Sequence, residues 1–355
     1  MEKVTLQDLV KELGVSKGTI GRVLRGSADV SQETRRKVLA AIEKYDYRPD
    51  KIARTLSLKT KKIKIGAIYQ KAPEFFWKHI KEGFLSAAGE FNDFGLEVLY
   101  REIDSNRNVD ELLQKIDELV DEKVDAITMV PLCNEKLERK IQETIGKGIA
   151  VSTFNDDIKN SGRLFYIGPQ MRQSGRIAGE LMGKFLRGKG NILTINGDIE
   201  SMAYKERLEG FTEVIQERYR DITIITNYTC NYEKMRNEAD NIIAAMIKNM
   251  DGIAGIYNVD GATLHNIAGI LKKNRRPEDI SLIGHERWSQ VDRLISEGFI
   301  DASICQDSFT EGYLAIKILF SYLLEKKKPE HEEIFVRSDI IISENLDWPG
   351  AERMP

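Results

Sequence analysis

Short apolar stretches alternate with longer amphipathic stretches from Ile65 to near the end of the chain. The pattern predicts ten β-strands, at 65–69, 96–101, 126–130, 150–154, 165–168, 191–196, 222–227, 252–257, 281–284 and 302–305. Helical patterns such as 76–94, 171–186 and 232–247 separate most of them. Such alternation is typical of parallel sheets joined by right-handed crossovers. Because ten strands over about 280 residues exceed one comfortable sheet, we expect two stacked α/β lobes, with the first crossing between them near 161–164.

The N-terminal residues have a different, purely helical pattern. The stretch from Thr5 to Arg25 predicts two short helices joined by a turn at Gly14-Val15, with Thr5 and Ser16 as N-caps, and a third helix starts after Ser31. Apolar side chains recur at helical spacing in all three, at Leu6, Leu9, Val10 and Leu13, at Ile20, Val23 and Leu24, and at Val38, Ala41, Ile42 and Tyr45. Any small helical domain can show such stripes. A helix-turn-helix can also lay its second helix in the major groove of DNA.

The distribution of charge favours the DNA-binding interpretation. Residues 1–64 carry 16 Lys and Arg against 8 Asp and Glu, which gives +8, whereas the remainder carries 37 against 48, which gives −11. A basic segment on an acidic body suits phosphate contact through one end of the chain. The alternative is a merely solvated basic face.

Composition and cysteine content limit the class of protein. With 41% apolar and 31% charged residues, the chain is expected to be globular, and no apolar run is long enough to span a membrane. The start, MEKVTLQDLV, lacks the features of a secretory signal, so we expect a cytoplasmic protein. Cys133, Cys230 and Cys305 have no metal-ligand spacing and are expected to be reduced thiols.

The segment 49–62 links the two regions. Pro49 can begin a helix that places Ile52, Ala53 and Leu56 on one side. So short a helix needs support, so we expect it to fold only with DNA and a partner copy, Leu56 acting as a wedge in the minor groove. The alternative is a plain linker.

Specific motifs resemble those of the lactose-repressor (LacI/GalR) family. In the head they are Val15 to Leu24 (VSKGTIGRVL), Val30-Ser31 with Thr34-Arg35, and Tyr47-Arg48-Pro49. Weaker motifs in the remainder resemble that family's periplasmic-sugar-binding-like core, at Phe75-Phe76, Tyr166 to Gly168, Arg207 with Gly210-Phe211, Ile283-Gly284, and Ile304 with Gln306-Asp307. The resemblance covers nearly the whole chain.

The resemblance implies an all-α head followed by a two-lobed α/β core of the periplasmic-binding-protein type. We expect a helix-turn-helix domain at 1–48, a hinge helix and linker at 49–62, a core at 63–345 and a tail at 346–355. Lobe 1 is expected at about 63–161 and 288–320, and lobe 2 at about 162–287 and 321–345. The tail has no apolar heptads, which favours a homodimer over a coiled-coil tetramer.

The family resemblance also implies a near-palindromic double-stranded DNA operator. Lys17 and Gly18 would occupy specificity positions, and Arg22 is the best candidate for a bidentate contact to guanine. The remaining expected DNA-binding residues cap helices, touch phosphates or lie in the hinge. They are Thr5, Ser16, Thr19, Arg25, Ser31, Thr34, Ala53 and Leu56.

An effector site is expected at the carboxyl ends of the core strands, where open α/β sheets bind ligands. Aromatic faces, carboxylates and amides at those ends suit a polyhydroxylated ligand. The expected effector-binding residues are Phe75, Phe76, Asn155, Asp157, Arg207, Tyr232, Asn258, Asp260, Glu286 and Gln306. Alternatives remain: Phe75 and Trp77 as core, and Asp156 and Asp260 as helix caps. His285 is either a ligand contact, which we favour, or a satisfied interior histidine.

The charge of these residues constrains the ligand. Glu74, Asp157, Asp260, Glu286 and Asp307 outnumber Arg207, which favours a neutral sugar or polyol, or a cationic amino derivative, over a phosphorylated ligand.

Catalytic motifs are absent from the sequence. It contains no phosphate-binding loop, dinucleotide fingerprint, nucleophile elbow or zinc-protease motif, and His79, His265, His285 and His331 share no metal-ligand spacing. We therefore predict no enzyme, no cofactor and no metal. The prediction is a DNA-binding regulator that represses carbohydrate or polyol catabolism genes. The rivals are a sugar kinase or isomerase fused to a DNA-binding head, and a solute-binding protein for transport.

Overall fold

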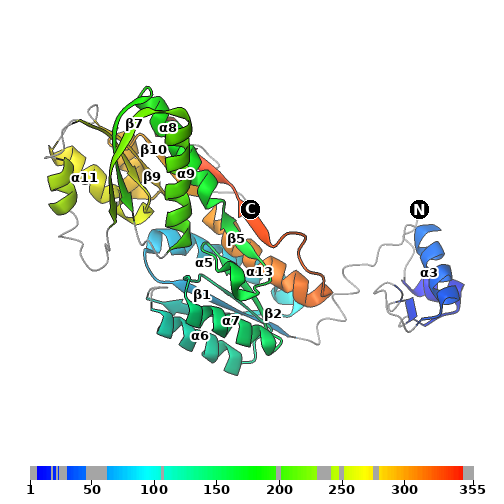
Figure 1. Cartoon of the computed structure of the whole chain (residues 1–355). Coiled ribbons are helices and arrows are strands. Elements are labelled where there is room, and N and C mark those ends of the chain that lie inside the picture. The colour runs from blue at the N-terminus through cyan, green and yellow to red at the C-terminus, as the bar shows by residue number, and fades with distance from the viewer. Residues whose placement is uncertain are drawn as a thin grey trace. The chain divides into compact units, whose positions relative to one another are not determined.

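The computed structural model describes residues 6–16, 19–20, 23, 30–44, 62–104, 108–196, 201–229, 241–247, 252–274 and 280–346. The chain divides into two compact units, residues 1–62 with 93–95, and residues 63–92 with 96–355. The first is called the head below and the second the core (Figure 1).

The described part of the head is helical and closes around a small apolar cluster. Helix α1 spans Leu6–Leu13 and α3 spans Gln32–Lys44. Gly14 follows α1 with a φ of +63°, a conformation that glycine adopts without steric cost. The cluster contains side chains from all three predicted helices, namely Leu9, Ile20, Val23, Val38 and Ala41. The expected stripes therefore form one core wherever the residues are described.

The core contains two six-stranded sheets. The first, sheet A, has the order β11-β5-β4-β3-β1-β2, and all its strand pairs are parallel. Its strands are β1 (Ile63–Gln70), β2 (Leu96–Ile103), β3 (Ala126–Met129), β4 (Ala150–Phe154), β5 (Tyr166–Pro169) and β11 (Glu333–Val336).

Helices cover both faces of sheet A. Helices α6 (Val109–Asp121) and α7 (Glu135–Gly146) bury Leu112, Ile116 and Leu137 against one face, while α5 (Glu74–Phe91) and α13 (Ser308–Glu325) pack together on the other (Figure 1). Short 3₁₀ turns lie at η1 (Asn92–Phe94) and η2 (Lys159–Ser161). Burial on both faces explains why these strands are almost continuously apolar.

The second sheet, sheet B, has the order β12-β10-β9-β8-β6-β7, in which only the β10–β12 pair is antiparallel. Its strands are β6 (Lys189–Asn196), β7 (Asp221–Thr229), β8 (Ile253–Asn258), β9 (Ser281–His285), β10 (Ala302–Gln306) and β12 (Ser338–Ile341). Its helical elements are α8 (Met171–Phe185), α9 (Met202–Arg218), η3 (Gly261–Thr263), α11 (Leu264–Asn274), α12 (Ser289–Ser296) and η5 (Ser343–Asn345).

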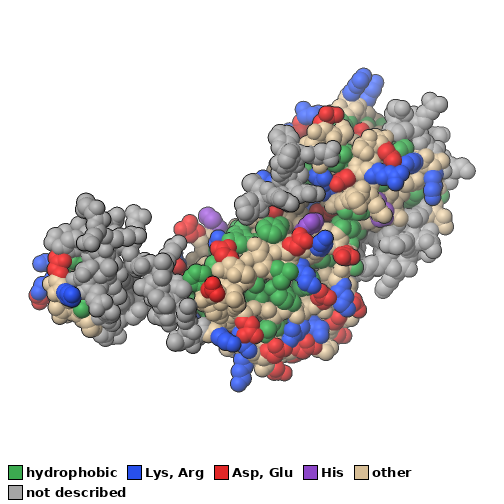
Figure 2. All heavy atoms as spheres, turned by 180° about the vertical axis from the view of Figure 1, so that it is seen from behind, with side chains coloured by type: hydrophobic (Ala, Val, Ile, Leu, Met, Phe, Trp, Pro, Cys, Tyr) green, Lys and Arg blue, Asp and Glu red, His purple; other side chains and the backbone are tan. Residues whose placement is uncertain are grey.

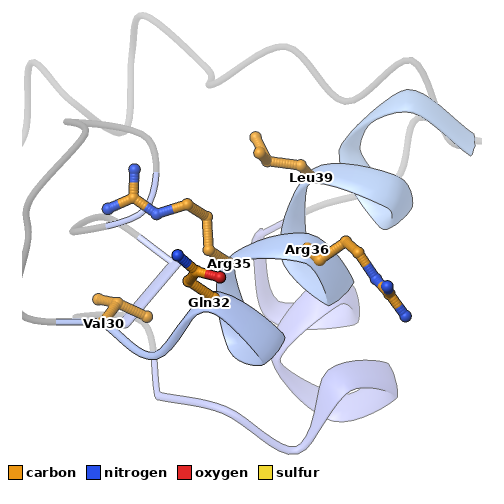
Figure 3. Close-up of a pocket in the computed structure, with 5 residues that line it drawn as sticks. All are labelled: Val30, Gln32, Arg35, Arg36 and Leu39. Carbon is orange, nitrogen blue, oxygen red and sulfur yellow. The ribbon is translucent and has the colours of Figure 1, made fainter.

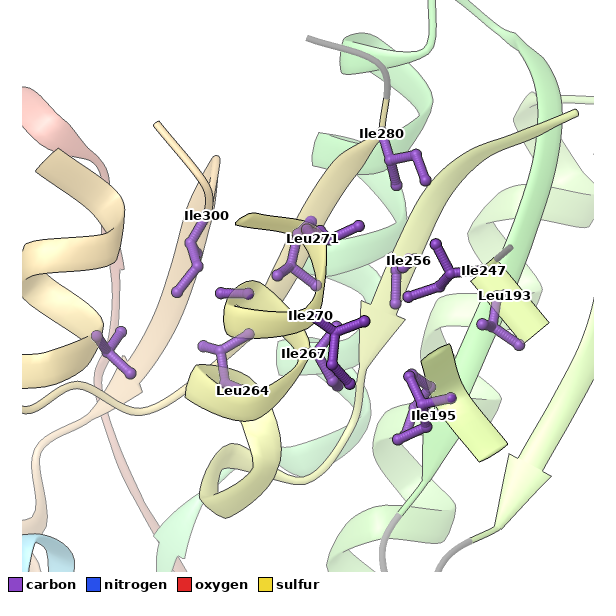
Figure 4. Close-up of a cluster of buried hydrophobic side chains, with 14 of the residues drawn as sticks. Leu193, Ile195, Ile247, Ile256, Leu264, Ile267, Ile270, Leu271, Ile280 and Ile300 are labelled. Carbon is purple, nitrogen blue, oxygen red and sulfur yellow. The ribbon is translucent and has the colours of Figure 1, made fainter. Parts of the chain in front are cut away.

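An isoleucine-rich cluster joins sheet B to α11. Ile267 and Leu271 of α11 pack with Leu193 and Ile195 of β6 and Ile256 of β8 (Figure 4). Side chains of α8 and α9 form a separate cluster with Ile192, Tyr257 and Ile283. Helices on both faces thus bury sheet B as they bury sheet A, and the carboxyl ends of its parallel strands share one edge.

The predicted lobe boundaries are wrong in two places. Strand β5 pairs with β4 through Thr153 and Tyr166, so the first crossing follows Pro169 instead of lying near 161–164. Strand β10 belongs to sheet B, although 288–320 was assigned to lobe 1, while α13 does pack on the first lobe. Two strands were missed: β11 extends sheet A and β12 extends sheet B, so the chain crosses between the sheets again at Arg337.

None of the helices in the described ranges is long and apolar enough to cross a membrane.

Candidate functional site

Two serine caps shape the described part of the head. The backbone N–H of Thr19 donates to Ser16 Oγ (3.1 Å), and that of Thr34 donates to Ser31 Oγ (3.2 Å). The paired hydroxyls also lie within hydrogen-bond distance, at 2.9 Å for Ser16 and Thr19 and 2.8 Å for Ser31 and Thr34. All four of these predicted residues therefore serve as cap partners. The other predicted DNA-binding residues lie outside the described ranges, namely Thr5, Lys17, Gly18, Arg22, Arg25, Ala53 and Leu56.

An open hollow of about 500 Å³ lies beside the first turns of α3. Val30, Gln32, Arg35, Arg36 and Leu39 line it, and Arg35 and Arg36 extend to different sides of the helix (Figure 3). None of the predicted effector residues lines this hollow. On the face of the core that Figure 2 shows, acidic and basic side chains lie interspersed, so that face presents no extended basic surface.

The predicted effector residues of the core gather where strands of both sheets end. Phe75 follows β1, Asn155 follows β4, Asn258 ends β8, Glu286 follows β9 and Gln306 ends β10. Tyr232 lies outside the described residues. Because parallel strands of one sheet end at a common edge, these side chains share two adjoining edges.

Direct contacts join the two edges. Gln306 Nε2 donates to Asn155 Oδ1 across the sheets (3.1 Å), and Asn155 has a positive φ of 61°. The rings of Phe75 and Trp288 stack with centroids 3.8 Å apart and planes inclined by 17°. By contrast, Phe76 is 9% exposed and packs edge-on against the buried Trp77. Phe75 is thus the aromatic residue that reaches the opposite lobe, while Trp77 belongs to the core.

Asp156 is the carboxylate that bridges the lobes. Ser201, the N-cap of α9, donates its hydroxyl to Asp156 Oδ2 (2.9 Å), and the backbone N–H of Asp157 donates to Oδ1 (2.9 Å). Burial raises the pKa of Asp156 to about 7, although these hydrogen bonds act in the opposite direction. The cap expected of Asp156 therefore acts across the two sheets, on a helix of the other lobe.

The carboxylate of Asp157 contacts an arginine of its own loop. Arg163 donates Nε to Asp157 Oδ1 and Nη2 to Oδ2, each at 2.5 Å, and Thr153 Oγ1 also donates to Oδ1 (2.8 Å). The two charged side chains are only 5% and 8% exposed. Both oxygens of Asp157 are thus engaged in a bidentate pair within the loop between β4 and β5.

Arg207 and Glu286 form the ion pair of the site. Arg207 Nη2 lies 3.3 Å from Glu286 Oε1, with the two side chains 5% and 13% exposed, and Nη1 donates to Val259 O (3.4 Å). A side chain at Gly175 of α8 would overlap the carbonyl oxygen of Arg207, so close helix packing fixes this part of α9. Burial raises the pKa of Glu286 to about 7, and Arg207 offsets part of this effect.

Asn258 and Asp260 are engaged with their own loop. Asp260 Oδ1 accepts from the backbone N–H of Ala262 (3.0 Å) and from the Tyr204 hydroxyl (3.2 Å), which makes it the cap of η3. Asn258 Oδ1 accepts from Thr263 Oγ1 (3.0 Å) and its amide donates to the carbonyl of Asp260. Both lie at the edge of sheet B as expected, and the cap alternative describes Asp260.

His285 is a satisfied interior histidine, contrary to the interpretation favoured from the sequence. It is fully buried, with the Tyr257 hydroxyl 2.9 Å from Nε2 and Ser174 Oγ 3.4 Å from Nδ1. Burial and the positive charge of Arg207 hold its pKa well below the ordinary value. Within the described ranges, no group of three or more His, Cys, Asp and Glu side chains is arranged to hold a metal ion.

Sequence reasoning missed two side chains of this region. Trp288 lies only two residues beyond Glu286, so the strand-end criterion could have found it. Glu311 lies on α13 and is fully buried, with no hydrogen-bond partner for either oxygen among the described residues. In the sequence, a glutamate within an amphipathic helix looks the same whether it is buried or exposed, so the pattern did not indicate that Glu311 is buried.

Comparison with known proteins agrees with this architecture. Residues 5–50 match the family described as bacterial regulatory proteins, lacI family, and residues 65–328 match the periplasmic binding protein domain. Catabolite control protein A of Staphylococcus aureus is 24% identical over 366 residues, covering 99% of each chain. The protein of that name from Priestia megaterium is 23% identical, covering 90% of this chain and 92% of its own.

Solved structures share the fold of the core. GanP, a glucose-galactose binding protein from Geobacillus stearothermophilus, superposes with a TM-score of 0.73 at 21% identity, covering 81% of this chain and 99% of its own. A putative LacI transcriptional regulator from Bacteroides fragilis gives a TM-score of 0.71 at 20% identity, with the same coverage. At this level of identity, the likeness establishes the fold alone.

Proposed function

Because this chain belongs to the lacI family of bacterial regulatory proteins, we propose that it is a repressor of carbohydrate or polyol catabolism genes that responds to a sugar-like effector. It binds a near-palindromic operator as a homodimer, with one head on each half-site. The effector binds between the two lobes of the core.

The observation that carries the proposal is the direct contact between the two strand-end edges. Asn155 meets Gln306, Asp156 meets Ser201 and Phe75 meets Trp288, each across the two sheets. Amides, carboxylates and stacked aromatic rings are the groups that recognise hydroxyls and the apolar faces of a sugar. The name of one structure with the same fold, a glucose-galactose binding protein, supports the same ligand class.

The proposed mechanism is a shift between two arrangements of the lobes. An effector that enters between the edges replaces contacts such as that of Asn155 with Gln306, so it changes the balance between arrangements. It can alter DNA affinity only by the difference in its binding free energy between them. The effector and operator sites are therefore coupled reciprocally.

Operator binding is tested with the full-length protein at physiological salt. Footprinting on a library of twofold-symmetric duplexes is expected to select one palindrome over random sequence, because specific complexes exceed non-specific binding by about a thousandfold or more. Arg22→Ala is expected to relax this selection. Lys37→Ala is the charge-matched control, since Lys37 already pairs with Glu33 on the exposed face of α3. Equal binding to all duplexes would contradict the proposal.

The same samples test the rival function. A sugar kinase fused to a DNA-binding head would hydrolyse ATP in the presence of a sugar, whereas the proposed regulator changes its footprint with one sugar and leaves ATP intact.

A further inference from the structure

Glu311 is a buried carboxyl whose presence the fold does not explain. It lies in the first part of α13, where its backbone N–H donates to Asp307 O (3.1 Å), so the helix is regular there. The side chain is 0% exposed, and neither Oε1 nor Oε2 has a partner in the described part of the chain. An unpartnered buried polar group costs free energy that a leucine at the same place would not.

The position of Glu311 relates it to both edges of the effector site. Gln306, five residues earlier, spans to Asn155 of the opposite lobe, and α13 itself packs along α5 and against β4 and β5. The charges of Glu286, which follows β9, and of Arg207 on α9 affect the pKa of Glu311, and the charge of Glu311 raises the pKa of Tyr166 on β5. Glu311 is thus within electrostatic range of groups on each lobe.

The neighbouring cations are already committed to other carboxylates. Arg207 pairs with Glu286, and Arg163 pairs with Asp157. Asp307 accepts from the backbone N–H and the hydroxyl of Thr310 (3.1 and 2.8 Å), and Arg337 lies 3.9 Å from it. Among the residues that the structure describes, no cation forms an ion pair with Glu311.

The buried atoms without a hydrogen-bond partner around Glu311 are mostly acceptors. Oε1 of Gln306 is buried without a partner, like both oxygens of Glu311, whereas the corresponding unpartnered donor at the site is Arg207 Nε. Once Glu311 is ionised, its two oxygens and Oε1 of Gln306 are acceptors without a donor among the described residues. An ammonium group offers three donors, no acceptor and a positive charge, while a hydroxyl offers a single donor and no charge.

We propose that the effector carries a cationic amine in addition to its hydroxyl groups, as an amino sugar does, and that Glu311 is the counter-ion that selects it. The inference rests on the proposed effector function and narrows its ligand class. A phosphorylated or acidic sugar would instead place negative charge beside three buried carboxyl groups, those of Asp156, Glu286 and Glu311, and would oppose their ionisation.

Binding of an amine is expected to release the proton of the Glu311 carboxyl. Burial, followed by the charges of Glu286 and Asp307, raises the pKa of Glu311 well above its ordinary value, which favours the neutral carboxyl before the ligand arrives. When an ammonium group binds, the carboxyl releases its proton to the buffer and becomes the carboxylate partner of the ammonium. No proton moves when a neutral sugar binds.

Calorimetry on the full-length protein tests the inference. The probes are matched pairs, D-glucosamine with D-glucose, D-galactosamine with D-galactose and D-mannosamine with D-mannose, each titrated at one pH in two buffers of different ionisation enthalpy. For one pair at least, we expect the amine to bind about tenfold tighter or more, as a charge-assisted hydrogen bond allows, with release of about one proton per site.

Glu311→Gln keeps the size of the side chain and removes its charge. It is expected to abolish the preference for the amine and the proton release, while the affinity for the neutral partner sugar changes little. Glu90→Gln, on the exposed side of α5 where Glu90 accepts from the Tyr313 hydroxyl, is the matched control. The proton count on the unmodified protein is independent of how well the variant folds.

The outcomes separate the two proposals. If a neutral sugar binds as tightly as its amine without proton release, the inference about the amine is overturned while the proposed function stands. If operator binding is specific but none of the six sugars binds, both the amine inference and the sugar class of effector are overturned.

Discussion

Replacing Asp157 by Asn distinguishes a structural role from a ligand role. In the parent protein its carboxylate holds Arg163 through two contacts of 2.5 Å, with both side chains under 10% exposed, and Arg163 Nη1 also donates to Glu332 O (3.0 Å) beside β11. The substitution leaves a buried guanidinium without a charge partner. Breaking such a pair costs about 3–5 kcal/mol of unfolding free energy.

Glu213→Gln is the control for Asp157→Asn. Glu213 accepts from two arginines, Arg176 at 2.9 Å and Arg172, but its side chain is 30% exposed and theirs are 25% and 52% exposed. Loss of such a pair near the surface costs about 1 kcal/mol or less.

Urea denaturation of the full-length variants, followed by circular dichroism, measures the difference. With a slope of about 3 kcal/mol per molar urea, the midpoint is expected to fall by about 1 M or more for Asp157→Asn and by about 0.3 M or less for Glu213→Gln. The reasoning is refuted if both variants unfold alike while Asp157→Asn weakens effector binding more than Glu213→Gln does, because Asp157 would then be a ligand residue.

Two further predictions concern the contacts between the lobes. Burial raises the pKa of Asp156 from 3.8 to about 7, so this group contributes stability at low pH that is lost as the pH rises through 7. Because the side chain of Asp156→Asn is neutral throughout, the unfolding free energy of this variant is expected to gain about 2–3 kcal/mol relative to the parent between pH 5 and pH 8. A difference in urea midpoint between the two proteins that stays constant with pH would contradict this prediction. The indole of Trp288 stacks on Phe75, so effector entry is expected to change tryptophan emission in the parent and in Trp77→Phe but not in Trp288→Phe. An emission change that persists in Trp288→Phe and is lost in Trp77→Phe would contradict this prediction.

The alternation of patterns predicted the strands because burial on both faces leaves a continuous apolar signature. It missed β11 and β12, which follow the charged stretch KKKPEHEE and are short and partly exposed. These strands gain their order from pairing with β5 and β10, a long-range effect that no local pattern reports. The same limit explains the misplaced crossing, since strand spacing does not say which sheet a strand joins.

The strand-end criterion located Asn155, Glu286 and Gln306, each of which makes a described contact at the joined edges. It did not predict that Arg163, six residues on, pairs with Asp157, because the path of that loop depends on β5. Glu311 escaped because its environment comes from the packing of α13 on sheet A, and helical position alone gives a glutamate no distinguishing mark. The sequence thus indicates where strands end, whereas contacts with residues from other elements determine which side chains remain available to a ligand.

The contacts between the lobes also limit how much an effector can change DNA affinity. The hydrogen bonds at Asn155 and Asp156 contribute about 1 kcal/mol each, and the stack of Phe75 on Trp288 adds about 0.5–1.5 kcal/mol beyond its buried area. These contacts together contribute a few kcal/mol to the arrangement with joined edges, the same scale as the coupling of about 1–3 kcal/mol that links sites in allosteric proteins. An effector that merely added contacts to this arrangement would reinforce it. One that inserts between Phe75 and Trp288 must replace their stack, so its influence on DNA affinity depends on which contacts it removes as much as on how tightly it binds.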